Sequence, residues 1–158
     1  MKKKNVQTRE NEQTKDFSMY FDNFTIREVL RPCTDEEQLS CIQNGYIDSL
    51  LILVMILDTF RNYLEHPIKI NSSFRDMEHN LKVGGSANSQ HMLGQAIDFT
   101  CNSMPFDEFQ QTFREFLNSS CLSSYLGQVI VYKSKKFIHI ALRNSRHPNL
   151  NIYEQGTN

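Results

Sequence analysis

Three residues combine metal-binding side chains with positions at which an ordinary core would be apolar. Asp98 lies in the alternating segment 95–101 and His139 in the alternating segment 137–142, each opposite the apolar side chains of its segment. A carboxylate or an imidazole is costly to bury without a partner. If the two segments pair as strands, Asp98 and His139 share one face of a sheet, and the preceding loop can fold His91 over them.

Two imidazoles and one carboxylate form a ligand set for catalytic zinc, with a fourth position open for water. Such an ion lowers the pKa of bound water toward neutrality and polarises a carbonyl group. The alternative is that Asp98 and His139 pair with each other or with backbone groups. His-x6-Asp with one distant histidine is a weak pattern, so the spacing alone leaves both interpretations open.

The segments that hold these residues alternate between helical and extended periodicity. The pattern predicts helices over 48–64, 76–82 and 105–117, with Asp48 or Ser49 as the cap of the first, and strands over 68–72, 95–101, 129–132 and 137–142. The last two strands read as a hairpin, and 86–94 reads as a loop. Helices mixed with short, hairpin-like strands predict an α+β fold.

Length and composition limit the number of domains and the class of protein that these elements can form. The chain has 158 residues and a formal net charge of -1, which predicts one domain over 17–158 behind a disordered, polar tail over 1–16. The near-neutral charge argues against nucleic acid as a partner. No signal peptide and no membrane-spanning segment are expected, which predicts synthesis in the cytoplasm. The four cysteines are expected to be free, buried thiols.

Further residues around the three candidate ligands form a longer pattern. It comprises Ser72-Ser73-Phe74-Arg75, Asn80, Gly84-Gly85-Ser86, Ser89-Gln90-His91, Gly94, Ala96, Asp98 and Phe137-Ile138-His139. The pattern closely resembles the M15 peptidases, the family of zinc D-Ala-D-Ala carboxypeptidases and related phage endolysins. That family reads Ser-Gly-Tyr-Arg-Ser, Asn, Gly-Gly-Ser, Ser-x-His, Gly-x-Ala-x-Asp and Trp-Val-His, so Phe137 stands in place of a tryptophan. The resemblance extends more loosely from Phe24 to about Arg146.

The resemblance implies a small, mainly antiparallel sheet flanked by helices, as in hedgehog-type domains and DD-peptidases. It implies that His91, Asp98 and His139 bind Zn²⁺ and that stem peptides of peptidoglycan are the partners. It also implies that Arg75 holds a carboxylate or carbonyl of the substrate, for which a planar guanidinium is suited, and that Ser86 lies near the substrate. The alternatives are a surface salt bridge for Arg75 and a turn role for Ser86.

One departure from the family concerns the general base, often a glutamate a few residues before the last histidine ligand. Residues 116–153 contain five basic residues and no acidic one. A carboxylate from elsewhere, such as Glu154 or Glu78, could reach the site. Tyr132 or Lys136 could do acid–base work, although their ordinary pKa values near ~10 make both poor bases. The third possibility is a site that has lost catalysis.

Three functions follow from these interpretations. The leading hypothesis is a zinc metallopeptidase that hydrolyses peptide bonds in bacterial peptidoglycan, as a D-Ala-type carboxypeptidase or endopeptidase. It would be a phage lysis protein that acts on the wall after release. The second is a catalytically impaired zinc domain that binds cell-wall peptide or has a structural role. The third is a small virion or scaffolding protein. Bond specificity and oligomeric state stay open. The remaining histidines, His66, His79 and His147, are expected at the surface by default, with contact to a ligand residue as the alternative.

Overall fold

The computed structural model describes residues 21–156, and the expected tail over 1–16 lies outside them. Its helices are α1 (Ile26–Leu30), α2 (Asp35–Gln43), α3 (Tyr46–Leu64), α4 (Met77–Lys82) and α5 (Phe106–Ser119), with 3₁₀ helices η3 (Gln90–Leu93) and η4 (Cys121–Tyr125). Its strands are β1 (Lys69–Ser72), β2 (Ala96–Thr100), β3 (Leu126–Tyr132), β4 (Phe137–Leu142) and β5 (Asn151–Gln155). The expected α+β class is confirmed.

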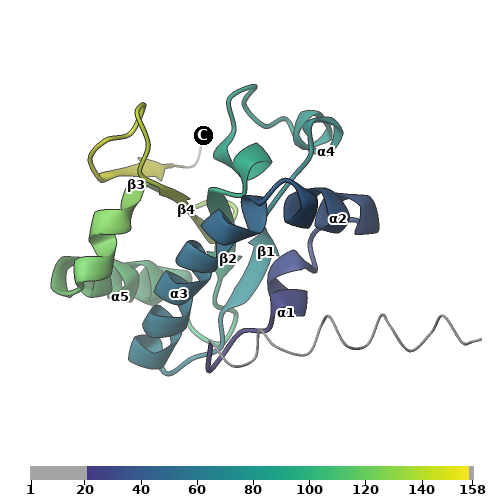
Figure 1. Cartoon of the computed structure of the whole chain (residues 1–158). Coiled ribbons are helices and arrows are strands. Elements are labelled where there is room, and N and C mark those ends of the chain that lie inside the picture. The colour runs from purple at the N-terminus through teal and green to yellow at the C-terminus, as the bar shows by residue number, and fades with distance from the viewer. Residues whose placement is uncertain (1–20, 157–158) are drawn as a thin grey trace, which may run out of the picture.

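The five strands form one sheet in the order β1-β2-β4-β3-β5 (Figure 1). All neighbours are antiparallel except β3 and β5, which run parallel. The expected pairing of the two alternating segments is confirmed, because Asp98 of β2 lies opposite His139 of β4. The expected hairpin is present as β3 and β4, with Tyr132 opposite Phe137.

Helices α3 and α5 cover one face of the sheet (Figure 1). Phe60 of α3 lies at the centre of an aromatic cluster, with ring centroids 4.8 Å from Phe113 and 5.2 Å from Phe116 of α5. Phe99 of β2 joins the cluster 5.3 Å from Phe113. The phenylalanine stripe of α5 is therefore core, which leaves the opposite face of the sheet free for polar chemistry.

Local sequence signals explain where the N-terminal helices begin. Thr25 and Thr34 each accept a hydrogen bond from the backbone of the glutamate three residues later, whose side chain bonds back to the threonine backbone. These two capping boxes fix α1 and α2. Helix α3 begins at Tyr46, after Gly45 with φ of 72°, so the expected caps at Asp48 or Ser49 are wrong. The left-handed glycine, rather than a side-chain cap, makes the sharp turn between α2 and α3.

Three further features of the structure differ from what the sequence predicted. Strand β5 was not predicted; all five of its residues are exposed, so no apolar alternation marks it. The segment 86–94 contains the short helix η3. Cys33, Cys41 and Cys101 are free and buried as expected, whereas Cys121 is exposed.

Among the described residues, no single helix is both long and apolar enough to cross a membrane. The bent pair α2 and α3 meets the same test of length and composition only when the two helices are taken together.

Candidate metal centre

One row of paired residues crosses the whole sheet and contains two of the predicted ligands. Ser72 of β1 lies opposite Asp98, which lies opposite His139. His139 in turn lies opposite Ile130 of β3, and Ile130 opposite Tyr153 of β5. Laterally paired residues point to the same face, so this row lies on the face opposite the aromatic core.

The third predicted ligand reaches the row from η3. His91 is 3% exposed, and its Nε2 lies 3.3 Å from Oδ1 of Asp98. Nδ1 of His139 lies 2.8 Å from the same oxygen. The ligand atoms of the three residues all lie within 4.8 Å of one another, so the structure brings the predicted set together.

The tautomer of His91 follows from its second ring nitrogen. Nδ1 of His91 is hydrogen-bonded to the backbone carbonyl of Ser73, which can only accept, so Nδ1 carries the proton. In the neutral ring, Nε2 then presents a lone pair to the carboxylate of Asp98. Two electron-pair donors facing each other at 3.3 Å are satisfied by a cation between them, and not by a hydrogen bond.

The protonation states at the site agree with a cation site. Burial lowers the pKa of His91, which favours the neutral imidazole that a metal needs. Burial would raise the pKa of Asp98, but the two histidines that face it, His139 foremost, outweigh burial and hold that pKa well below its ordinary range. Two imidazoles and one carboxylate suit zinc at ~2.0–2.2 Å, and tetrahedral ligand atoms at that distance lie roughly 3.3 Å apart. The separation of 3.3 Å between Nε2 of His91 and Oδ1 of Asp98 fits such an ion, whereas the 2.8 Å between Nδ1 of His139 and the same oxygen is a hydrogen-bond distance.

Arg75 lies beside the ligands, on the loop between β1 and α4. Its Nη2 donates to Oδ2 of Asp98 at 2.6 Å, and its Nε donates to Oγ of Ser72 at 2.7 Å. The guanidinium is therefore hydrogen-bonded to Oδ2, the carboxylate oxygen that faces away from the two histidines. A partner of this kind fixes the orientation of a metal ligand.

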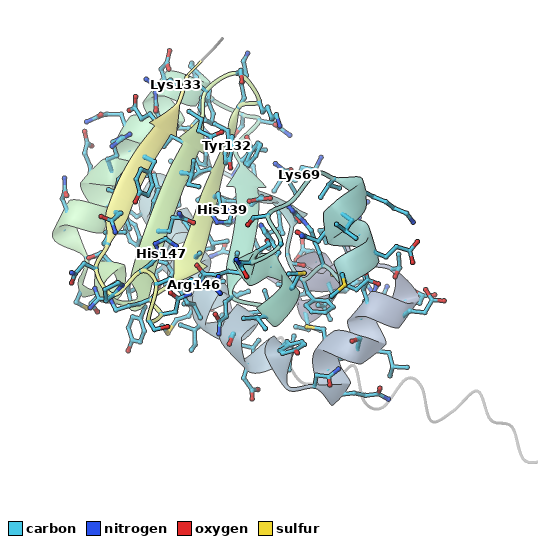
Figure 2. All side chains as sticks on the ribbon, turned by 90° about the horizontal axis from the view of Figure 1, so that it is seen from above. Lys69, Tyr132, Lys133, His139, Arg146 and His147 are labelled. Atoms are coloured by element: carbon cyan, nitrogen blue, oxygen red, sulfur yellow. The ribbon has the colours of Figure 1, made fainter. Side chains whose placement is uncertain are left out.

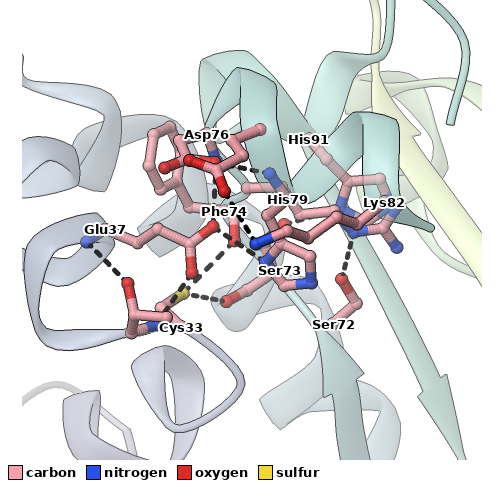
Figure 3. A network of polar contacts seen from close by, with 12 residues as sticks. Cys33, Glu37, Ser72, Ser73, Phe74, Asp76, His79, Lys82 and His91 are labelled. Atoms are coloured by element: carbon pink, nitrogen blue, oxygen red, sulfur yellow. Dashed lines mark hydrogen bonds and ion pairs between the residues drawn. The ribbon is translucent and has the colours of Figure 1, made fainter.

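A buried polar network supports this loop from the N-terminal helices (Figure 3). Glu37 of α2 is 1% exposed; its Oε1 accepts from the backbone N–H of Asp76 at 3.0 Å and lies 2.8 Å from Nδ1 of His79. Burial would raise the pKa of Glu37, but hydrogen bonds from Thr34, Asp76 and His79 outweigh it and lower that pKa. The ionised carboxylate ties α2 to the segment that carries Arg75.

The same network reaches His91 through Ser73. The Ser73 hydroxyl donates to the carbonyl of Val29 at 2.6 Å and lies 3.3 Å from Sγ of Cys33. The backbone carbonyl of Ser73 accepts the hydrogen bond from Nδ1 of His91. Helix α1 and the turn that follows it therefore fix the carbonyl that sets the tautomer of this ligand.

The glycine pair Gly84-Gly85 is part of the pocket lining. Gly84 has φ of 70°, as a turn glycine should. Gly85 is needed for a different reason, since a Cβ there would lie 2.1 Å from Oδ1 of Asn80. Nδ2 of Asn80 donates to the carbonyl of Ser86 at 2.9 Å, so Asn80 ties α4 to the loop that follows it.

A pocket of about 800 Å³ opens over the three ligands. Its lining contains all three, together with Arg75 and Ser86, so the residues with predicted substrate contacts face the same space. Tyr132 also lines the pocket and stacks on Phe137, with ring centroids 4.4 Å apart. Burial, reinforced by Asp98, raises the pKa of Tyr132 above its ordinary value, so its hydroxyl is protonated at neutral pH.

The other candidates for the base lie elsewhere. Lys136 is exposed in the β3–β4 turn and is not part of the pocket lining. Glu78 pairs with Lys82 at 2.7 Å on the surface of α4. Glu154 pairs with Lys133 at 2.7 Å and lies opposite Val131, whose side chain is buried. Among the described residues that line the pocket, Asp98 is the one acid.

Several pocket residues were missed from the sequence. His79 and His147 line the pocket although both were expected at the surface, whereas His66 contacts Ser103 away from it. A single histidine in a short helix, such as His79 in α4, or in a turn carries no sequence signal that places it in the pocket. Gln128 also lines the pocket, and a signal for it existed, because it lies at the alternating positions of β3 that share a face with Tyr132.

Comparisons with known proteins agree with this geometry. The sequence model of the family described as Peptidase M15 matches residues 22–141, which include all three ligands. The zinc D-Ala-D-Ala carboxypeptidase of Streptomyces albus G is 35% identical over 93 residues. That match covers 58% of this chain and 36% of the relative, so the chain spans little more than a third of that protein.

Proposed function

Because the chain belongs to the peptidase M15 family, we propose that it is a zinc-dependent metallopeptidase that hydrolyses peptide bonds at D-alanine in peptidoglycan. The substrate class rests on the family and on the similar carboxypeptidase of Streptomyces albus G. The zinc assignment rests on His91, Asp98 and His139.

The observation that carries the proposal is the facing pair of electron-pair donors at Nε2 of His91 and Oδ1 of Asp98. A structural ion pair would place a proton between these atoms, but the Ser73 carbonyl takes the imidazole proton at Nδ1. The site also opens into a pocket, as a catalytic zinc site must, whereas structural zinc sites are closed by a fourth protein ligand.

The residues of the chain divide the work of hydrolysis. His91, Asp98 and His139 would hold the zinc ion, which when bound would supply the Lewis acid for activating water and polarising the peptide carbonyl. Arg75 holds Asp98 in its ligating orientation and is part of the pocket lining. Tyr132 offers a protonated hydroxyl on the pocket wall and is the proton donor we assign to the departing amine. The proton that the attacking water releases would then return to the Tyr132 oxygen, so that the protons balance over one turnover.

A second function is favoured by one observation. Asp98 is the one acid in the described pocket lining, and its carboxylate is already held by Arg75 and the histidines. A pocket without a free carboxylate would suit a zinc domain that binds wall peptide without cleaving it. Digestion of purified peptidoglycan separates the two functions.

The experiment compares the zinc-loaded chain with the His91→Ala variant. Release of amino groups from purified peptidoglycan by the intact chain, and its loss in the variant, supports the peptidase. The matched control is His66→Ala, whose side chain lies outside the pocket. Binding of peptidoglycan without release of amino groups by the fully zinc-loaded chain would leave the binding domain as the function.

A further inference from the structure

The pocket over the metal centre is strongly basic. Besides Arg75, its lining contains Lys135 and Arg146, and the one acid in the described lining is Asp98. Both added cations come from the acid-free segment 116–153. The two histidines and the carboxylate suffice to bind zinc, so the positive charge of Lys135 and Arg146 is not needed for metal binding.

Lys135 and Arg146 lack carboxylate partners within residues 21–156. Arg75 holds Asp98 at 2.6 Å, and Glu154, the acid on β5, is held by Lys133 and Arg114. Arg146 contacts the amide oxygen of Asn88 at 3.3 Å, which leaves its charge uncompensated. Cations that line a concave site attract anionic ligands and raise their local concentration.

The two cations lie on either side of the predicted ligand His139. Lys135 precedes β4 and its Nζ lies 6.0 Å from the centre of the Tyr132 ring. Arg146 follows β4. Figure 2 shows Tyr132 toward one end of the strands, Arg146 toward the other end, and His139 between them.

We propose that the pocket binds a peptide with one carboxylate on each side of the bond to be cleaved, and that Lys135 and Arg146 each hold one of the two. The inference rests on the proposed function, since it names the substrate class of the same site. Arg75 is not one of these anchors because Asp98 and Ser72 already engage its guanidinium. The Tyr132–Phe137 stack supplies an apolar surface on the Lys135 side of the site.

The test uses four synthetic peptides built around one D-alanyl-D-alanine bond. They carry glutamate or glutamine on the acyl side and a free carboxylate or an amide at the C-terminus. Dissociation constants are measured by calorimetry with the zinc-loaded chain, and amine release is followed separately. Neutralising either carboxylate should weaken binding about fivefold, and the effect should shrink at high salt.

Variants assign each carboxylate to its anchor. Lys135→Gln should abolish the dependence on one carboxylate and Arg146→Gln the dependence on the other. Lys133→Gln and Arg143→Gln are the matched controls, because both neighbours are exposed and lie outside the pocket lining. Both controls should retain the full charge dependence of the unmodified chain.

The outcomes separate this inference from the proposed function. Equal binding of the four peptides, or equal effects of the controls and the anchor variants, overturns the inference even if cleavage occurs. Charge-dependent binding without amine release supports the inference and overturns the peptidase. Absence of both binding and cleavage for all four peptides overturns both.

Discussion

Nη2 of Arg75 lies 2.6 Å from Oδ2 of Asp98, while Oδ1 of the same carboxylate faces the two histidines. The two oxygens of Asp98 therefore have different partners. One is held by a permanent cation and the other is directed to the metal centre. The family resemblance implied substrate binding for Arg75; the contact gives it a positioning role toward Asp98 as well.

Replacing Arg75 should therefore weaken zinc binding. Arg75→Gln removes the charge that holds Oδ2, and partners of this kind typically contribute ~10–100-fold to metal affinity. We expect a loss of about tenfold in zinc affinity, measured by competition with a chromogenic chelator. Arg75→Lys should recover only part of it, because an ammonium cannot bond Ser72 and Asp98 as a planar fork does.

The control for this measurement is Arg143→Gln, which removes an exposed guanidinium outside the pocket. Its zinc affinity should equal that of the unmodified chain. Unchanged zinc affinity in Arg75→Gln would show that the contact with Asp98 has no role in metal binding, and would leave Arg75 to the substrate alone.

Two of the three ligands, Asp98 and His139, were predictable because the sequence showed their residue types and their common face of the sheet. Asp98 and His139 interrupt two alternating segments, and pairing of those segments makes them lateral neighbours. The register itself was not predictable from either segment alone, since a slip by one residue would move His139 to the apolar face. The longer family pattern around Arg75 and His91 favoured a metal site over simple pairing of Asp98 with His139.

The missed features lack a local signal. Strand β5 pairs with β3 in parallel across a long connection, and its exposed residues show no apolar alternation. Glu37 reads as an ordinary acid in a helix start, yet it is buried because Asp76 and His79, far along the chain, donate to it. Contacts of this kind depend on how elements pack, which periodicity does not reveal.

Removal of the Tyr132 hydroxyl should slow catalysis without unfolding the chain. Tyr132→Phe keeps the stacking on Phe137 but loses the proton donor, and acid–base groups typically contribute ~10²–10⁴-fold. We expect kcat on a D-alanyl-D-alanine peptide to fall about 100-fold with little change in melting temperature. Since the pKa of Tyr132 is raised, its hydroxyl should stay protonated across the neutral range.

Lys136→Gln tests the other candidate named from the sequence. Because Lys136 is exposed and outside the pocket lining, kcat should stay unchanged. A large loss of kcat in Lys136→Gln, with normal rates in Tyr132→Phe, would assign the proton transfer to the lysine instead.

The four cysteines should differ in reactivity in the native protein. Cys121 is exposed, whereas burial raises the pKa of Cys41 to about 12 and also raises that of Cys33. Because the thiolate is the reacting form, a chromogenic disulfide reagent at neutral pH should modify one thiol quickly. Cys121→Ser should remove that fast phase, and denaturant should expose all four in the unmodified chain. Two fast thiols in the native protein would contradict the burial of at least one of Cys33, Cys41 and Cys101.

Loss of the Glu37 charge should destabilise the fold in a pH-dependent way. Glu37→Gln keeps the shape of the side chain but weakens the bonds from Asp76 and His79, and hydrogen bonds to charged groups contribute ~1.5–3 kcal/mol. We expect about 2 kcal/mol less unfolding free energy at pH 7 from urea denaturation. Glu36→Gln, at an exposed neighbour, should change it by less than ~0.5 kcal/mol.

The sign of the pH dependence follows from the lowered pKa of Glu37. A carboxyl group with a lower pKa in the folded state stabilises the fold above its unfolded pKa of ~4.3, and this contribution disappears as the pH falls through the folded value. The difference between the unmodified chain and Glu37→Gln should therefore be full at neutral pH and shrink below pH ~4. A difference that stays constant down to pH ~2 would show that Glu37 acts through packing and not through its charge.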